Sequence, residues 1–162
     1  MNPASRDVAP LDITIREVMT PFPHSIGLDQ SLSLAKERMR EFNIRHLPVQ
    51  DGGKLVGIVT DRDMSFALGL EKKSDDEMSV EEVYTAEPYT VSAGTRLGRV
   101  LEHMAKDHIG CALVLEHDKL VGIYTTVDAC RDLSLLLEQG PDALGRTSSF
   151  RTTPAAAQRG SA

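Results

Sequence analysis

Two stretches of the chain combine short apolar runs with turn residues in the pattern of β-hairpins. The predicted strands are His46–Gln50 and Lys54–Val59 around a turn at 51–53, and Cys111–Leu115 and Lys119–Tyr124 around a turn at 117–118. Runs of five or six residues rich in Val, Ile and Leu and separated by Gly or Asp are typical of paired strands. Each hairpin is therefore expected to form the middle of a small sheet.

Apolar residues at steps of three and four predict an amphipathic helix before each hairpin. They are Leu32, Ala35, Met39 and Phe42 before the first hairpin, and Leu97, Val100, Leu101 and Met104 before the second. Asp29 or Ser31 is expected to cap the first helix and Thr95 the second, because their side chains can accept hydrogen bonds from free backbone N–H groups.

Short helices at Ile15–Met19 and Val80–Tyr84, each followed by an extended segment near residues 25 and 90, are predicted ahead of these elements. A last helix is expected after each hairpin. The first is Arg62–Leu68, capped by Thr60 or Asp61 and ended by Gly69; the second is Val127–Leu137, capped by Thr125 or Thr126 and ended by Gly140.

The two halves are copies of one unit. The pentapeptide KLVGI occurs at 54–58 and again at 119–123, and the same offset of 65 positions aligns the surrounding sequence without a gap. Identical pairs include Glu17/Glu82, Leu32/Leu97, Met39/Met104, Ile44/Ile109, Thr60/Thr125 and Asp63/Asp128. Two similar buried strands would explain the pentapeptide but not a match along the whole unit, so a duplication is inferred.

The predicted fold class is α/β (α+β in some schemes), with two β-α-β-β-α repeats at 12–70 and 80–138. Two units of this size are expected to pack sheet to sheet about a pseudo-twofold axis and to share one core. Residues 71–79, EKKSDDEMS, are polar and predict a linker. Residues 1–11 form an N-terminal tail, and 139–162 lack an apolar period and predict a disordered tail.

Composition limits the classes of function that the chain could have. The net charge is −6, aromatic residues make up 4% and there is no Trp, which argues against nucleic-acid binding. No apolar run is long enough to span a membrane, and the first residues do not resemble a secretory signal. The two cysteines, Cys111 and Cys130, lack metal-ligand spacing and fit a reducing compartment. The expected location is the cytoplasm.

The repeated chemistry lies where the second strand of each hairpin meets its helix. Thr60 with Asp63, and Thr125 with Asp128, stand at helix N-termini, where free N–H groups favour an anion such as phosphate. A carboxylate there can accept hydrogen bonds from the two hydroxyls of a ribose. The alternative is plain helix capping. Glycines 57 and 122, three positions before each threonine, permit close approach of backbone or ligand.

The run Ile44–Val49, then GIVTDRD at 57–63 and GIYTTVD at 122–128, resembles a tandem pair of cystathionine-β-synthase (CBS) domains over about Asp12 to Leu137. The resemblance implies β-α-β-β-α units that pair into a disc-like module, usually dimers of such modules, and clefts that bind adenosine-containing ligands such as AMP, ADP, ATP or S-adenosylmethionine. Some family members bind other nucleotides or metal ions.

The resemblance also implies roles for single residues. Thr60 and Thr125 would contact phosphate or ribose, and Asp63 and Asp128 would hold the ribose hydroxyls. Arg45 and His46 stand where nucleotide-binding members often carry basic residues that bind phosphate, and Pro48 belongs to the same run. Arg62 either reaches the phosphate or is a solvated helix residue. The second repeat has Gly110, Cys111 and Leu113 in place of Arg45, His46 and Pro48, so two unequal sites are expected.

No residue pattern indicates an enzyme. There is no G-x-S-x-G motif, no histidine pair has metal-site spacing, and Cys111 and Cys130 are expected to pack inside the protein. The prediction is a regulatory module without catalytic residues, obligatory cofactor or metal, which binds AMP, ADP or ATP, forms a homodimer and signals to an unknown effector protein. The alternatives are a ligand-independent dimerisation scaffold or accessory subunit of an enzyme, and a module that binds a metal or S-adenosylmethionine.

Overall fold

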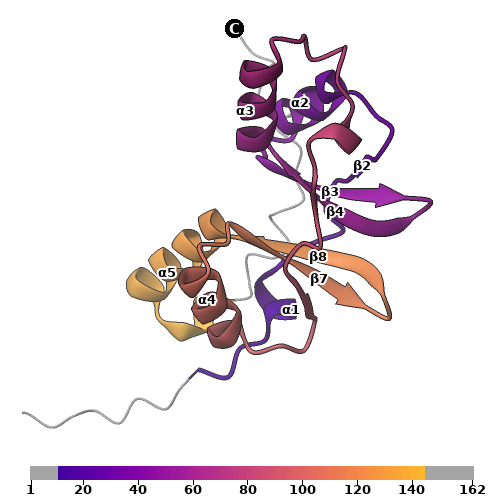
Figure 1. Ribbon diagram of the computed structural model, residues 1–162. Coiled ribbons are helices and arrows are strands. Elements are labelled where there is room, and N and C mark those ends of the chain that lie inside the picture. The colour runs from indigo at the N-terminus through magenta and orange to yellow at the C-terminus, as the bar shows by residue number, and fades with distance from the viewer. Residues whose placement is uncertain (1–10, 145–162) are drawn as a thin grey trace, which may run out of the picture.

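Each predicted hairpin lies inside a four-stranded sheet in the computed structural model, which describes residues 11–144 (Figure 1). The first sheet has the order β2 (Ile26–Gly27), β3 (His46–Asp51), β4 (Lys54–Thr60) and β5 (Thr85–Ala86). The second has the order β1 (Thr20–Pro21), β8 (Lys119–Thr125), β7 (Cys111–Glu116) and β6 (Thr90–Ser92). Read from β5 and from β1, the two sheets have the same order of equivalent strands.

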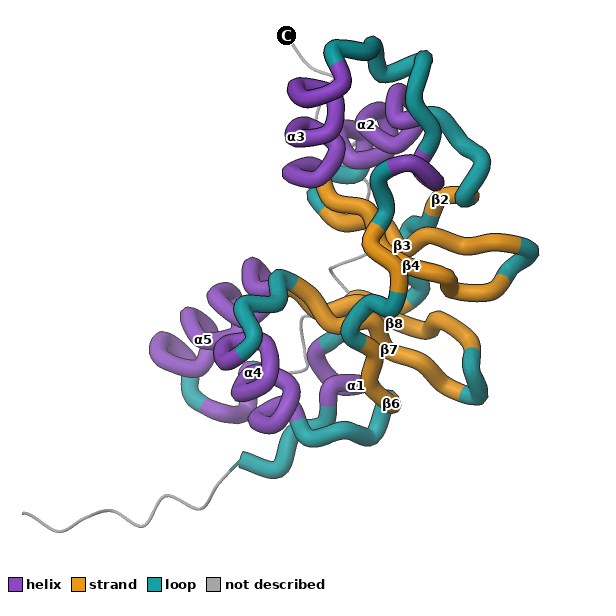
Figure 2. The backbone as a smooth tube through the Cα atoms, in the orientation of Figure 1, coloured by secondary structure: helices purple, strands orange, loops and turns teal. Residues whose placement is uncertain are grey.

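Helices cover the outer side of each sheet, and the strands of the two lobes face each other in the middle of the molecule (Figure 2). The first lobe carries α2 (Leu32–Glu41), α3 (Asp61–Glu71) and the 3₁₀ turn η1 (Val80–Glu82). The second carries α1 (Ile15–Val18), α4 (Leu97–Lys106), α5 (Thr126–Gln139) and the 3₁₀ turn η2 (Pro141–Ala143). The predicted mixed fold of two repeats is confirmed.

The two repeats exchange their first segments, which the sequence did not reveal. Strand β1 of the first repeat pairs with β8 of the second, and β5 of the second pairs with β4 of the first. Ile15 and Val18 are fully buried in the core of the second lobe, and Val80 is fully buried in the core of the first. Each lobe is therefore completed by residues from the other repeat.

The glycine of the KLVGI motif makes room for this exchange. A Cβ atom built on Gly57 would lie 2.4 Å from the carbonyl oxygen of Thr85 and 2.3 Å from the ring of Tyr84. A Cβ on Gly122 would lie 2.2 Å from the sulfur of Met19. All three distances are far below van der Waals contact, so a Cβ atom at either position would force the crossing segment to shift. Close approach of backbone, one of the two expected causes, is observed at Gly57, whereas the group that approaches Gly122 is the side chain of Met19.

Buried apolar residues form three clusters, so the expected single shared core is wrong. One cluster lies inside each lobe. The third lies between the sheets and contains Ile58 from the first repeat with Cys111, Leu113 and Ile123 from the second. Burial raises the pKa of the Cys111 thiol to about 12, as expected for an inert buried cysteine. Cys130 is exposed, contrary to expectation.

The duplication extends to backbone detail. His46 pairs with Thr60 in the first hairpin as Cys111 pairs with Thr125 in the second, and both ladders shift register at equivalent positions. Left-handed residues recur at the same offset, at Asn43 and His108 for example. The backbone at these turns is therefore conserved between the repeats even where the side chains differ.

Ser31, Thr60 and Thr125 are confirmed as helix caps, but several other local predictions were wrong. The residue at the N-cap of α4 is Arg96, not Thr95. Helix α3 continues through Gly69 and ends at Lys72, whose left-handed backbone closes it. Gly140 does end α5.

The expected linker 71–79 is packed against the first lobe. Glu71 belongs to α3, Met78 is buried, and Lys36 of α2 forms an ion pair with Asp75. Of the tail predicted at 139–162, Gln139 ends α5 and η2 follows. Residues 1–10 and 145–162 lie outside the described residues.

Replacing the two motif glycines by alanine is expected to destabilise the protein unequally. Gly122→Ala should cost about 1–3 kcal/mol, because the flexible side chain of Met19 can move. Gly57→Ala should cost more, because the carbonyl of Thr85 in β5 cannot yield without breaking the strand pair. Urea unfolding of both variants measures the difference.

Gly98→Ala is the matched control, since no atom lies within 4 Å of its Cβ position on α4. This change should stabilise the protein by about 0.5–1 kcal/mol. Equal free energies of unfolding for the Gly57 and Gly122 variants would contradict the explanation.

Candidate functional site

The first candidate site lies where β4 ends and α3 begins. The Thr60 hydroxyl donates to Oδ2 of Asp63 at 2.6 Å and accepts from the Asp63 backbone N–H at 3.1 Å. Thr60 is therefore a true helix cap, as the alternative reading proposed. The Thr60 hydroxyl occupies only one oxygen of the half-buried Asp63 carboxylate: among residues 11–144, the Asp63 side chain has hydrogen bonds only to Thr60.

Alternation along the strands turns Thr60 toward the other lobe. Successive side chains of a strand point to opposite faces, so Thr60 shares a face with Ile58, which lies in the cluster between the sheets. His46 is opposite Thr60, and Pro48 is opposite Ile58, in the β3–β4 ladder. Pro48 is buried, unlike half-buried His46 two residues before it on the same face of the strand.

His46 brings the two repeats together. A Cβ atom on Gly110 would lie 3.1 Å from its Nε2 atom, so the imidazole is close to the backbone of the second repeat. Burial lowers the pKa of His46 below its usual range, and nearby Arg45 acts in the same direction. The carboxylates of Asp63 and Asp128 oppose this shift. His46 therefore interacts electrostatically with an aspartate of each repeat.

The two arginines of the first site are exposed. Arg45 precedes β3, and its carbonyl accepts a hydrogen bond from the N–H of Asp61, which fixes it beside the first turn of α3. Arg62 lies in that turn. Both residues therefore adjoin the helix N-terminus, where free N–H groups already favour an anion.

The second candidate site repeats the cap but is more fully hydrogen-bonded. The backbone N–H and hydroxyl of Thr125 donate to Oδ2 of Asp128 at 2.9 and 2.8 Å. Arg131 donates to Oδ1 of Asp128 at 2.9 Å. Asp128 is buried, and so is Asp132 one turn later, which accepts a hydrogen bond of 2.8 Å from Tyr124.

The sequence analysis missed Arg131 and the Tyr124–Asp132 pair. The spacing of three between Asp128 and Arg131 is one at which helical side chains meet, and could have suggested the ion pair. Nothing in the spacing indicates that both aspartates are buried. The predicted inequality of the two copies now has a structural description, since Asp63 and Asp128 have different partners.

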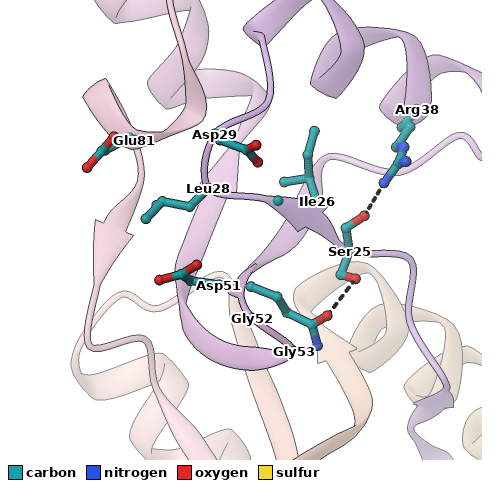
Figure 3. A pocket seen from close by; sticks show the side chains of 11 residues that line it. Ser25, Ile26, Leu28, Asp29, Arg38, Asp51, Gly52, Gly53 and Glu81 are labelled. Carbon is teal, nitrogen blue, oxygen red and sulfur yellow. Dashed lines mark hydrogen bonds between the residues drawn. The ribbon is translucent and has the colours of Figure 1, made fainter.

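A separate pocket of about 570 Å³ lies in the first lobe, beside β2 and the β3–β4 turn (Figure 3). Its charged lining comprises Asp29, Asp51, Glu81 and Arg38, and Arg38 donates a hydrogen bond to the carbonyl of Ser25. No residue of the predicted nucleotide site lines it. The three carboxylates make it unfavourable for a phosphate group.

Two further properties concern the described part of the chain. Residues 11–144 contain no group of three or more His, Cys, Asp or Glu side chains placed to hold a metal ion. None of the helices in this range has the length and apolar character needed to cross a bilayer.

Two repeats that exchange outer strands, with a Thr–Asp cap at each strand-to-helix junction, define a tandem-repeat regulatory module. The sequence model of the CBS domain matches residues 15–69 and 80–134, and the chain belongs to this family. The predicted family is thereby confirmed over both repeats.

Relatives include proteins longer than this module. The chain is 31% identical over 119 residues to L-aspartate semialdehyde sulfurtransferase of Methanocaldococcus jannaschii. The aligned part covers 72% of this chain and 22% of the enzyme. The chain thus spans about a fifth of that relative's length.

Two solved structures resemble most of the chain. AcuB from Vibrio cholerae has a TM-score of 0.74 and 34% identity, covering 80% of this chain and 97% of AcuB. The CBS domain pair of protein MJ0100, in complex with 5′-methylthioadenosine and S-adenosyl-L-methionine, has a TM-score of 0.68 and 28% identity, covering 76% of this chain and 98% of that one.

Proposed function

We propose that this CBS pair binds an adenosine-containing ligand of the AMP, ADP or ATP class at the first candidate site and signals to a partner protein. The observation that carries the proposal is the Asp63 carboxylate, which accepts a hydrogen bond from the Thr60 hydroxyl with one oxygen and has its other oxygen available for a ribose. Arg45, His46 and Arg62 surround the same helix start. The solved complex of MJ0100 with two adenosine compounds supports the ligand class.

The charges favour a phosphate over the other adenosine compounds. Arg45 and Arg62 are cationic, and His46 becomes so when an anion beside it favours its protonated form. S-adenosylmethionine carries a positive sulfonium, which these groups would repel. The pocket in Figure 3 has the opposite character, with Asp29, Asp51 and Glu81 in its lining. A nucleotide phosphate is therefore assigned to the first candidate site and not to this pocket.

Signalling would use the contact between lobes. His46 lies against Gly110 of the second repeat and within the field of Asp128. A ligand that draws His46 toward a phosphate would favour one arrangement of the two lobes, and differential binding of this kind is what a regulatory module needs. The effector is a protein not identified by the sequence, and a cytoplasmic location stays a prediction.

The exposed helix faces favour a second function, dimerisation with another copy of the chain. The apolar side chains that share this exposure are Phe66 and Leu70 of α3 and Val127, Leu133 and Leu137 of α5, each more than half exposed. Large apolar groups gathered on two helices mark an interaction surface more often than free surface. The homodimer is compatible with ligand binding, but a scaffold would need only this surface.

Replacing Asp63 by alanine is expected to abolish the thermal stabilisation by AMP, because the ribose hydroxyls lose their acceptor. At a ligand concentration 100 times its dissociation constant, the wild type should gain about 2.7 kcal/mol. Asp61→Ala is the matched control, since it removes the same charge from the same helix turn without touching Thr60. If Asp63→Ala is stabilised as strongly as wild type, the ribose assignment is wrong.

Replacing Arg45 by alanine is expected to weaken AMP by roughly ten- to hundredfold, the equivalent of one charge-assisted hydrogen bond. Adenosine, which lacks the phosphate, should bind wild type and variant alike. Isothermal titration of both ligands measures the difference. An equal loss for AMP and adenosine would exclude a phosphate role for Arg45.

Leu70→Glu is expected to convert the homodimer to a monomer, because it places a charge in the apolar surface of α3. Sedimentation velocity of wild type and variant measures the mass. Glu71→Gln is the control, since it changes a neighbouring exposed charge without burying one. A monomeric wild type, or a Leu70→Glu variant that remains dimeric, contradicts this surface.

A further inference from the structure

The two repeats differ at the third residue after the motif aspartate. In the first repeat this residue is Phe66, whose side chain is 73% exposed. In the second it is Arg131, whose guanidinium holds Oδ1 of Asp128 at 2.9 Å. Because α3 and α5 start from equivalent caps, the two positions occupy the same place relative to their aspartates.

Arg131 completes the hydrogen bonding of Asp128. One carboxylate oxygen accepts from the backbone and hydroxyl of Thr125, and the other accepts from Arg131. A ribose would need these same oxygens for its two hydroxyls. The side chain of Asp128 is only 9% exposed, and Arg131 already occupies Oδ1, the oxygen that Thr125 leaves for a ligand.

The Asp63 carboxylate has no ion pair equivalent to that between Asp128 and Arg131 among the described residues. Among the residues that the structure describes, only Thr60 is hydrogen-bonded to it, and the carboxylate is half-buried. Phe66 offers no hydrogen-bond donor. The ribose hydroxyls can therefore bind Asp63 without breaking an ion pair.

The charged residues near the two aspartates also differ, and this difference too favours a phosphate at the first site. The first site has Arg45, His46 and Arg62, whereas the equivalent positions of the second are Gly110, Cys111 and Val127, none of which carries a positive charge. Asp132 adds a buried acidic group one turn beyond Asp128. A phosphate beside Asp128 would be near Arg131, which is already paired, and near His46 of the first repeat, whose charged form is disfavoured by burial.

We infer that Arg131 is a specificity-determining residue that closes the second ribose position, so that each chain takes one adenine nucleotide. This inference rests on the proposed function of the first site. Arg131 takes the place of the ligand: its guanidinium donates to Oδ1 of Asp128, the kind of hydrogen bond that a ribose hydroxyl would donate to Asp63. The stoichiometry of the module follows from a single helical position.

The test is a reciprocal exchange at that position, read as AMP bound per chain by isothermal titration or equilibrium dialysis. Wild type should bind one AMP. Arg131→Ala should bind a second, weaker AMP, because Asp128 becomes accessible. Phe66→Arg should weaken binding at the first site by roughly tenfold or more, because the new guanidinium can pair with Asp63. Phe66→Gln, which removes the ring without adding charge, should still bind one AMP at wild-type affinity.

Thermal melting first establishes that each variant is folded, and the Arg131→Ala,Asp63→Ala double variant shows whether the second site alone binds AMP. Two AMP molecules per wild-type chain, or an Arg131→Ala variant that still binds one, overturn the inference while leaving the first site intact. Weaker binding by Arg131→Ala would mean that Arg131 contacts the ligand, and also overturns it. Absence of AMP binding in every variant overturns the proposed function together with the inference.

Discussion

The structure depends on two segments that cross from one repeat into the sheet of the other. Glycines 57 and 122 permit the crossing, since any side chain there would overlap β5 or Met19. Val80 then fills the core of the first lobe, and Ile15 that of the second. Because each core is completed by the other repeat, neither repeat has its full set of buried residues alone. The exchange also fixes the lobes face to face, with His46 against Gly110.

Duplication has preserved the backbone and changed the chemistry. Hairpin register, bulges and left-handed turns recur at one offset, so both repeats present a Thr–Asp cap on the same kind of helix start. The side chains around the caps have diverged. Arg45 and Arg62 adjoin the first cap, whereas the second adjoins buried Asp132 and has a paired arginine; His46 interacts electrostatically with the aspartates of both. A shared scaffold can therefore hold one site for an anion and one that is internally satisfied.

The sequence predicted what depends on local spacing. The offset between the KLVGI copies and the periodicity around them predicted the hairpins, the main helices and the caps at Ser31, Thr60 and Thr125. The sequence-based prediction was wrong where contacts between distant residues determine the local structure. The polar segment before Met78 packs on α2 through the Lys36–Asp75 ion pair, a contact that local propensity does not show. Helix α3 also continues past Gly69, which the sequence predicted as its end. The strand exchange leaves no periodic signal, so neither β1 nor β5 was anticipated.

The candidate site, like the fold, could be predicted only where it depends on local sequence. The Thr–Asp pairs follow from recurrence, whereas the state of each aspartate depends on burial and on partners that spacing does not show. The pocket in Figure 3 illustrates this independently. It is lined by Asp51 and Glu81, and the equivalent residues of the second lobe, Glu116 and Arg16, form an ion pair. At this position, as at Arg131, the second lobe contains an internal ion pair where the first has unpaired groups facing solvent. Two positions far apart in the repeat thus diverge in the same sense: among the described residues, the second lobe has an ion pair where the first lobe has an acidic group without one.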